Sequence, residues 1–216
     1  MQQETKNRLE ENYSTIYITI VSVLLGLALD DIVSILRDIE SISFFNWLTA
    51  AFSVHVIFNA WVGYSAVASI ARLVPSVWDA LNVFTLSMAH FALNSAIGEE
   101  PTVFFYTASC YSAVAGGVTY YNVWRANQDD SITIRPASFS RLIGINAAGA
   151  LAFLTAGALT QTTFLSTAVQ NYVVVLGIPF ATLWLIVFLR VWGANGLPVW
   201  RQSRISIEKT RNHNAE

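Results

Sequence analysis

Six long stretches of mostly apolar residues run along this chain, and short polar segments separate them. A helix needs about 20 apolar residues to cross the hydrocarbon core of a bilayer. The stretches are continuously apolar and do not alternate as the strands of a membrane barrel do, which favours helices. The sequence therefore predicts an all-α, polytopic membrane protein whose six transmembrane helices cover residues 13–36, 44–70, 76–97, 102–124, 139–160 and 166–192.

The composition agrees with lipid as the main solvent of the chain. Apolar residues make up 54% of it and charged residues only 12%. A soluble domain carries about 25% charged residues, roughly twice this fraction. The single cysteine, Cys110, excludes an intrachain disulfide. We expect an integral membrane protein whose main partner is the lipid bilayer, located in the plasma membrane of a bacterium or an archaeon.

Lysine and arginine are distributed unevenly between the two sides of the predicted helices. If the N-terminus is cytoplasmic, eleven of the twelve basic residues lie on the cytoplasmic side, and only Arg37 lies outside. Basic residues near span ends resist translocation, so this positive-inside pattern places both termini in the cytoplasm. The predicted organisation is a cytoplasmic segment at 1–12, a transmembrane domain at 13–192 and a basic cytoplasmic tail at 193–216.

The acidic residues follow the opposite pattern and favour cations as partners. Taken alone, Asp30 and Asp31 are typical of solvated residues at a membrane interface. Together with Glu99 and Glu100, they predict an acidic vestibule that concentrates cations. The net charge of −2 gives no support for a nucleic-acid partner. The outer side carries six carboxylates in this topology: Asp30, Asp31, Asp38, Glu40, Glu99 and Glu100.

The first predicted helix carries a narrow stripe of small and polar residues. Its members are spaced by four, three, four and four positions, which places them on one helical face. Small residues allow helices to approach closely, so a packing seam is one interpretation. Hydroxyl groups at this depth also line water-filled paths, so a pore-lining face is the other. The stripe consists of Thr15, Thr19, Ser22, Gly26 and Asp30.

Two histidines lie inside predicted spans, His55 in the second and His90 in the third. If these spans form an antiparallel hairpin, the rings lie within about 3 Å of the same depth. Asn59 and Asn94 each follow a histidine by four residues, so each could bond the imidazole on its own helix. The alternatives are interhelical hydrogen bonding, a proton-sensing or proton-relay pair, and a haem or metal held between the rings. Haem is the one cofactor considered, and no metal site is otherwise predicted.

The motifs of common membrane enzymes are absent from this sequence. It contains no Gly-x-Ser-x-Gly, no His-Glu-x-x-His and no Walker-type loop. No predicted span contains a lysine, which excludes a retinal Schiff base. The sequence therefore gives no support for a catalytic function, and we expect a protein that is not an enzyme.

The first four predicted spans resemble the endolysosomal-type transmembrane potassium channel family in its short bacterial form. The family hallmark is Arg-x-x-x-Phe-Ser-Asp before an apolar run that ends in Leu-Asp. In residues 8–15 (RLEENYST), Tyr13-Ser14 corresponds to the Phe-Ser pair of the hallmark. The pair lies one position farther from Arg8 than in the family, and Thr15 stands in place of the aspartate. The apolar run ends at Leu29-Asp30, and residues 79–82 (DALN) are similar to the Asp, Leu and Asn that begin the third helix of the family.

The resemblance implies an oligomeric cation channel, with potassium as the expected ion. In the family, four subunits surround a pore, and apolar residues of the first helix form its constriction. By position, Ile20, Leu24 and Leu27 would form it here, on the face opposite the small and polar stripe. Two other functions remain open: a non-catalytic structural or accessory subunit of a larger membrane complex, and a b-type haem electron carrier that uses His55 and His90.

Overall fold

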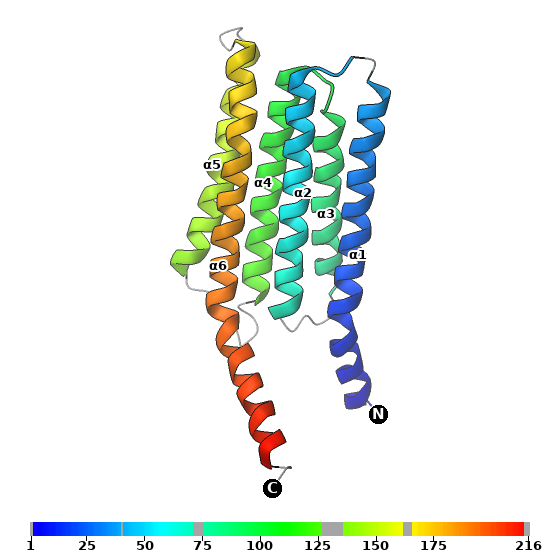
Figure 1. Cartoon of the computed structure of the whole chain (residues 1–216), viewed down its shortest axis with the longest axis vertical. Helices are drawn as coiled ribbons and strands as arrows, with labels where there is room; N and C mark the ends of the chain where they lie inside the picture. The colour runs from blue at the N-terminus through cyan, green and yellow to red at the C-terminus, as the bar shows by residue number, and fades with distance from the viewer. Residues whose placement is uncertain (1, 40, 71–75, 127–135, 162–165, 214–216) are drawn as a thin grey trace.

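The protein folds into a bundle of six long helices, shown in Figure 1. The computed structural model describes residues 2–39, 41–70, 76–126, 136–161 and 166–213. Glu40, Arg72 and Arg135, which belong to the charge pattern, lie outside these residues. The helices are α1 (Gln2–Asp38), α2 (Phe44–Ile70), α3 (Val77–Ser95), α4 (Pro101–Ala126), α5 (Pro136–Gln161) and α6 (Thr167–His213).

Successive helices run in opposite directions, and the chain ends at the same side of the bundle from which it starts (Figure 1). Helix α2 packs mainly against α6 and α1, whereas α3 packs mainly against α4 and α1. The most extensive helix pair is α4 with α5. Helices α1 and α6 extend well beyond the bundle at their terminal ends (Figure 1). The second and third helices are therefore antiparallel neighbours along the chain, as the predicted hairpin requires, but they make little contact with each other.

Four of the described helices are long and apolar enough to cross a membrane. These membrane-crossing segments are Thr15–Asp38, Phe44–Ala68, Ser140–Gln161 and Thr167–Val191. Helices α3 and α4 are more polar, and several of their polar side chains are turned into the bundle, including Asp79, His90, Asn94 and Thr119. The all-helical class is therefore confirmed, and the chain has helices suited to an integral membrane protein.

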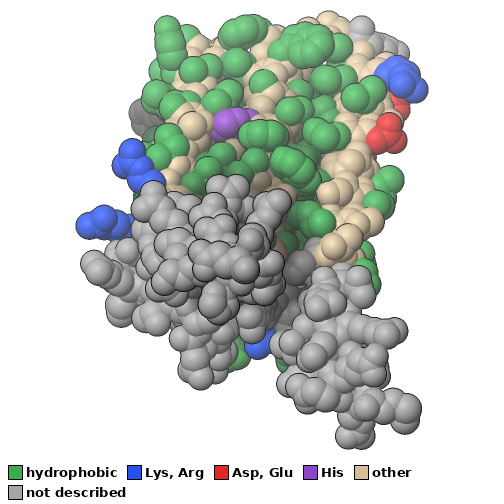
Figure 2. All heavy atoms as spheres, turned by 60° about the horizontal axis from the view of Figure 1, so that its bottom comes forward, with side chains coloured by type: hydrophobic (Ala, Val, Ile, Leu, Met, Phe, Trp, Pro, Cys, Tyr) green, Lys and Arg blue, Asp and Glu red, His purple; other side chains and the backbone are tan. Residues whose placement is uncertain are grey.

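Apolar side chains cover the outside of the bundle as well as its interior. In Figure 2, hydrophobic side chains cover much of the coloured surface, with backbone and polar groups between them, and the visible charged side chains lie toward its edges. Large exposed apolar residues occur on every helix, for example Leu27 on α1, Met88 on α3 and Leu151 on α5. A surface of this kind would aggregate in water and is suited to lipid.

Aromatic rings fill the core near the end of the bundle where α2 and α4 begin. Phe104 and Phe105 of α4 are fully buried, and edge-to-face contacts join them to α2. The ring centroids lie 5.9 Å apart for Phe45 and Phe104, and 5.4 Å apart for Phe52 of α2 and Phe153 of α5. Since lipid tails are as apolar as this core, its stability comes from such packing contacts rather than from transfer out of water.

Candidate functional sites

The small and polar stripe of α1 lies on the outside of the bundle. Thr15, Thr19, Ser22, Gly26 and Asp30 are all exposed. A Cβ atom built on Gly26 would have open space around it, with no described atom of another residue within 4 Å. Most of the stripe is therefore not covered by other described helices of the chain, and only Ser22 meets one, at its edge, where Trp61 of α2 donates to its hydroxyl. The rest of the stripe is available to lipid, water or a second copy of the protein.

The apolar candidates of α1 divide between the outer face and the bundle. Ile20 and Leu27 are 44% and 53% exposed, whereas Leu24 is half-buried and packs against the core. The side of α1 that faces the bundle is a third one, which includes the buried residues Val21 and Leu25. The stripe and the apolar set, which the sequence places on opposite faces, thus flank one shared outward surface. The bundle-facing side of α1, with Val21 and Leu25, lies on the opposite side of the helix from the surface that the two sets share.

Hydrogen bonds from neighbouring helices fix the rotation of α1. Asn94 of α3 donates through its amide nitrogen to the Ala28 carbonyl at 2.7 Å and to the Asp31 carboxylate at 3.2 Å. Trp61 of α2 donates its indole N–H to the Ser22 hydroxyl at 3.2 Å. The Asn94 contact turns Asp31 toward α3 and leaves Asp30 on the outward surface. The two neighbouring carboxylates therefore have different surroundings.

The described acidic residues of the predicted outer side gather at one end of the bundle. Asp30, Asp31 and Asp38 belong to the last two turns and a half of α1, and Glu99 and Glu100 lie in the connection before α4. Gly98 adopts a φ of 94° in this connection, and a Cβ there would lie 2.9 Å from the Ile39 side chain. This close approach shows that the α3–α4 connection packs beside the end of α1. The described carboxylates therefore form one acidic rim.

His90 is fully buried and turned toward α4. Its Nε2 lies 3.4 Å from the Tyr111 hydroxyl, and the ring centroids lie 4.8 Å apart. Among the described residues, His90 Nδ1 and Asn94 Oδ1 are both buried without a hydrogen-bond partner. The predicted bond between Asn94 and the imidazole is thus wrong. The amide reaches across to α1 instead, where it meets a backbone carbonyl and a carboxylate.

His55 is turned toward α6 and meets a different helix from the one that His90 meets. Its Nε2 lies 2.9 Å from the Thr182 hydroxyl, and Asn59 donates to the Ala181 carbonyl at 3.1 Å rather than to the imidazole. A haem shared by the two histidines would need both rings to face one gap. In the structure each imidazole is bonded to a different helix. Among the described residues, no group of three His, Cys, Asp or Glu side chains could hold a metal ion.

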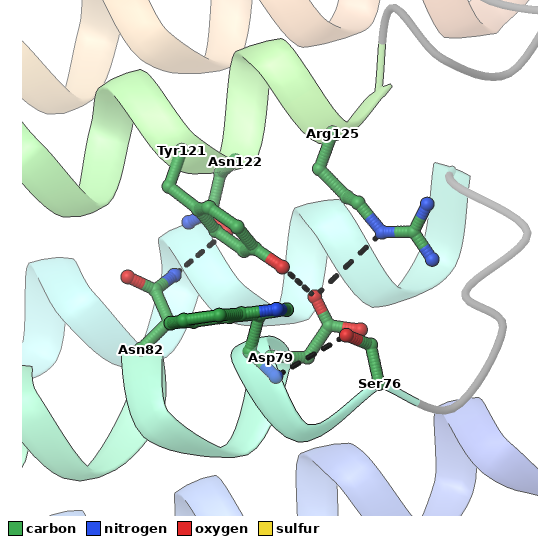
Figure 3. Close-up of polar contacts among 7 residues, drawn as sticks. Ser76, Asp79, Asn82, Tyr121, Asn122 and Arg125 are labelled. Atoms are coloured by element: carbon green, nitrogen blue, oxygen red, sulfur yellow. Dashed lines mark hydrogen bonds and ion pairs between the residues drawn. The ribbon is translucent and has the colours of Figure 1, made fainter.

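A polar cluster at the opposite end of the bundle joins α3 to α4 (Figure 3). Tyr121 donates its hydroxyl to the Asp79 carboxylate at 2.9 Å, and Arg125 Nε lies 3.9 Å from the same oxygen. Asn82 donates to Asn122 at 3.0 Å. Asp79 is 4% exposed and lies in the first turn of α3, where the helix dipole favours a carboxylate. Asp79 and Asn82 are two residues of the DALN segment, and both bind α4.

We expect Tyr121→Phe to destabilise the fold by about 1 kcal/mol, because it removes a hydrogen bond to a buried carboxylate while keeping the ring. Thermal unfolding in detergent should show a melting temperature lower by about 2 to 4 °C. The matched control is Tyr172→Phe on α6, where the ring is 67% exposed. Equal melting temperatures for the two variants would contradict a structural role for the cluster.

A cavity of about 80 Å³ lies between α2 and α6 on one side and α4 and α5 on the other. Leu86 of α3 also lines it. Aromatic rings form much of its wall, among them Phe52, Tyr64 and Tyr111, and Asn59 and Asn146 contribute polar groups. Sequence reasoning missed this site, since its lining residues are distributed over five helices with no local motif. The only signal available in the sequence was the presence of asparagines inside apolar stretches.

Comparison with known proteins adds no assignment to this geometry. No protein-family model, no curated protein and no solved structure matches the chain.

Proposed function

We propose that the protein is an oligomeric cation channel, with potassium as the expected ion. In this proposal six helices cross the membrane, both termini are cytoplasmic, and copies of α1 surround the pore. The observation that carries the proposal is the outward surface of α1, which bears Thr15, Thr19, Ser22 and Asp30 yet faces away from the bundle.

Polar groups on this surface favour water or another copy of the chain over lipid. A carboxylate that faces lipid is costly, whereas water-filled paths are lined by hydroxyl and carboxyl groups. Thr19 satisfies its own hydroxyl by donating to the Thr15 carbonyl at 2.8 Å, so its oxygen remains able to accept. Gly26 adds a site where helices can approach closely. These features support a symmetric arrangement of first helices around water.

The charge distribution supports cations rather than anions as the permeating species. The carboxylates of Asp30, Asp31, Glu99 and Glu100 lie at one end of the bundle, which the positive-inside pattern assigns to the outer side. Repeated around an axis, such a rim raises the local concentration of cations and repels anions. The same pattern places Arg125 and Arg190 toward the cytoplasm.

A flux assay tests the proposal directly. Liposomes that contain the purified protein and are loaded with potassium are expected to release potassium down its gradient. Liposomes loaded with chloride and an impermeant cation should retain their chloride. Protein-free liposomes and liposomes with heat-denatured protein serve as controls. Absence of cation flux over a range of pH would contradict the proposal. Absence together with stable co-purification of another membrane protein would favour the accessory-subunit alternative.

A further inference from the structure

The cavity between α2, α4, α5 and α6 has the character of a binding site for a neutral molecule. Among the described residues, those that line it include no charged side chain and no histidine. Its wall combines aromatic rings with a few amide and hydroxyl groups, as small-molecule sites do. A charged ligand would find no counter-ion there, so the chemistry of the wall selects against ions.

Several polar groups of the wall are already occupied within the protein. Ser112 donates to the Ala108 carbonyl at 2.9 Å, and Thr119 donates to the Ala115 carbonyl at 2.7 Å. Asn146 donates to the Leu142 carbonyl at 3.2 Å. The two hydroxyls therefore have no donor left for a ligand, and the Asn146 amide has used one of its two.

Two side chains that line the cavity each hold a buried polar atom without a partner among the described residues, one an acceptor and the other a donor. Asn59 is 4% exposed and its amide nitrogen is bound to Ala181, which leaves its carbonyl oxygen Oδ1 unsatisfied. Trp184 lies one turn beyond Ala181 on α6, and its indole Nε1–H is also unsatisfied. An unsatisfied buried group costs about 1 to 3 kcal/mol, so a ligand that satisfies both atoms gains binding free energy.

We propose that this cavity binds the hydroxyl group of a neutral apolar molecule. A hydroxyl is the smallest neutral group that donates and accepts at once, and it could donate to Asn59 Oδ1 while accepting from Trp184 Nε1–H. The cavity is smaller than the roughly 150 Å³ that an enclosed benzene site needs. It is partly open to the outside of the bundle, and Phe180, one of the α6 residues in its wall, is itself 37% exposed. The apolar body of the ligand therefore extends toward the lipid.

Photolabelling tests this proposal in the full chain. The protein in phosphatidylcholine vesicles is irradiated with an octanol analogue that carries a diazirine, and the labelled residues are mapped by mass spectrometry. We expect labels on residues that line the cavity, and about tenfold less labelling there by the methyl ether of the same analogue, which cannot donate. Equal labelling of the cavity by the alcohol and the ether in the unchanged protein would by itself overturn the proposal.

Trp184→Phe provides the matched variant, because it removes the indole donor and keeps an aromatic ring. Labelling by the alcohol should fall toward the level of the ether, whereas Trp47→Phe, at a ring that is 55% exposed, should leave it unchanged. If folded Trp184→Phe shows the same ratio of labelling by the alcohol to labelling by the ether, the proposed role of the indole N–H is contradicted. Competition distinguishes the ligand source: phenol represents a free alcohol and hexadecanol a lipid one. Failure of both to compete would also overturn the proposal.

Discussion

Replacing Asp30 with asparagine is expected to lower the potassium flux of the reconstituted protein by about tenfold at low ionic strength. The carboxylate lies on the outward surface of α1 at the acidic end of the bundle. In an oligomer its copies would form a ring at the pore entrance, and neutralising them removes the attraction that concentrates cations there. The measurement is the initial rate of potassium release from liposomes. Salt should shrink the difference, because the Debye length falls from about 30 Å at 0.01 M to 3 Å at 1 M.

Asp38→Asn is the matched control for this prediction. It removes the same charge from an exposed position at the end of α1, two turns beyond Asp30. The flux of Asp38→Asn should fall clearly less than that of Asp30→Asn, because Asp38 belongs to the rim but lies two turns away from Asp30. Equal losses in the two variants would mean that only the overall charge of the acidic rim matters. Full flux in Asp30→Asn would contradict a place for Asp30 beside the ion path.

Asn94→Ala is expected to destabilise the protein by about 2 kcal/mol, since its amide is fully buried and joins α3 to α1. The substitution leaves the Ala28 carbonyl and the Asp31 carboxylate without this donor. Individual hydrogen bonds inside membranes average about 0.6 kcal/mol, so two bonds and a small cavity together account for this value. The melting temperature in detergent should fall by about 4 to 8 °C.

Asn146→Ala provides the comparison for Asn94→Ala. Asn146 is half-buried, and the bond that it donates goes to the Leu142 carbonyl of its own helix. Its removal should therefore lower the melting temperature by less than half as much. If the two variants melt together, Asn94 does not hold α1 against α3, and the explanation for the rotation of α1 is wrong.

The helices could be predicted from the sequence because the length of an apolar run sets the length of a span. The predicted span at 44–70 coincides with α2 (Phe44–Ile70), and that at 76–97 differs from α3 (Val77–Ser95) by one and two residues. Helices α1 and α6 run well past the predicted limits, to Gln2 and His213. The apolar run of a span is as long as the hydrocarbon layer is thick, but the helix itself can continue into water. The apolar pattern therefore does not mark where these two helices end.

Helix rotation was the part of the fold that the sequence did not determine. In a soluble helix the apolar face marks the core, whereas in a membrane both the core and the lipid accept apolar side chains. Val21 faces the bundle and Val23 faces outward, although the two side chains are identical. The depth of His55 and His90 could be estimated from helical rise, but their directions depend on rotation. That dependence is why each histidine meets a different helix.

The polar contacts between helices were equally inaccessible from spacing alone. Asp79 and Tyr121 lie 42 positions apart, and Asn59 meets a carbonyl 122 positions away. Each contact forms because a polar side chain inside an apolar bundle must find a partner on whichever helix lies beside it. The sequence analysis singled out Asp79, in the DALN segment, and Asn59, four residues after His55, but not Tyr121, and the structure supplied the partners of both.

Cryo-electron microscopy of the protein in lipid nanodiscs tests the central claim most directly. The proposed channel predicts several copies around one symmetry axis, with α1 of each copy nearest the axis and Thr19, Gly26 and Asp30 turned toward it. A single copy in each nanodisc, or an assembly in which this surface of α1 faces lipid, would contradict the claim.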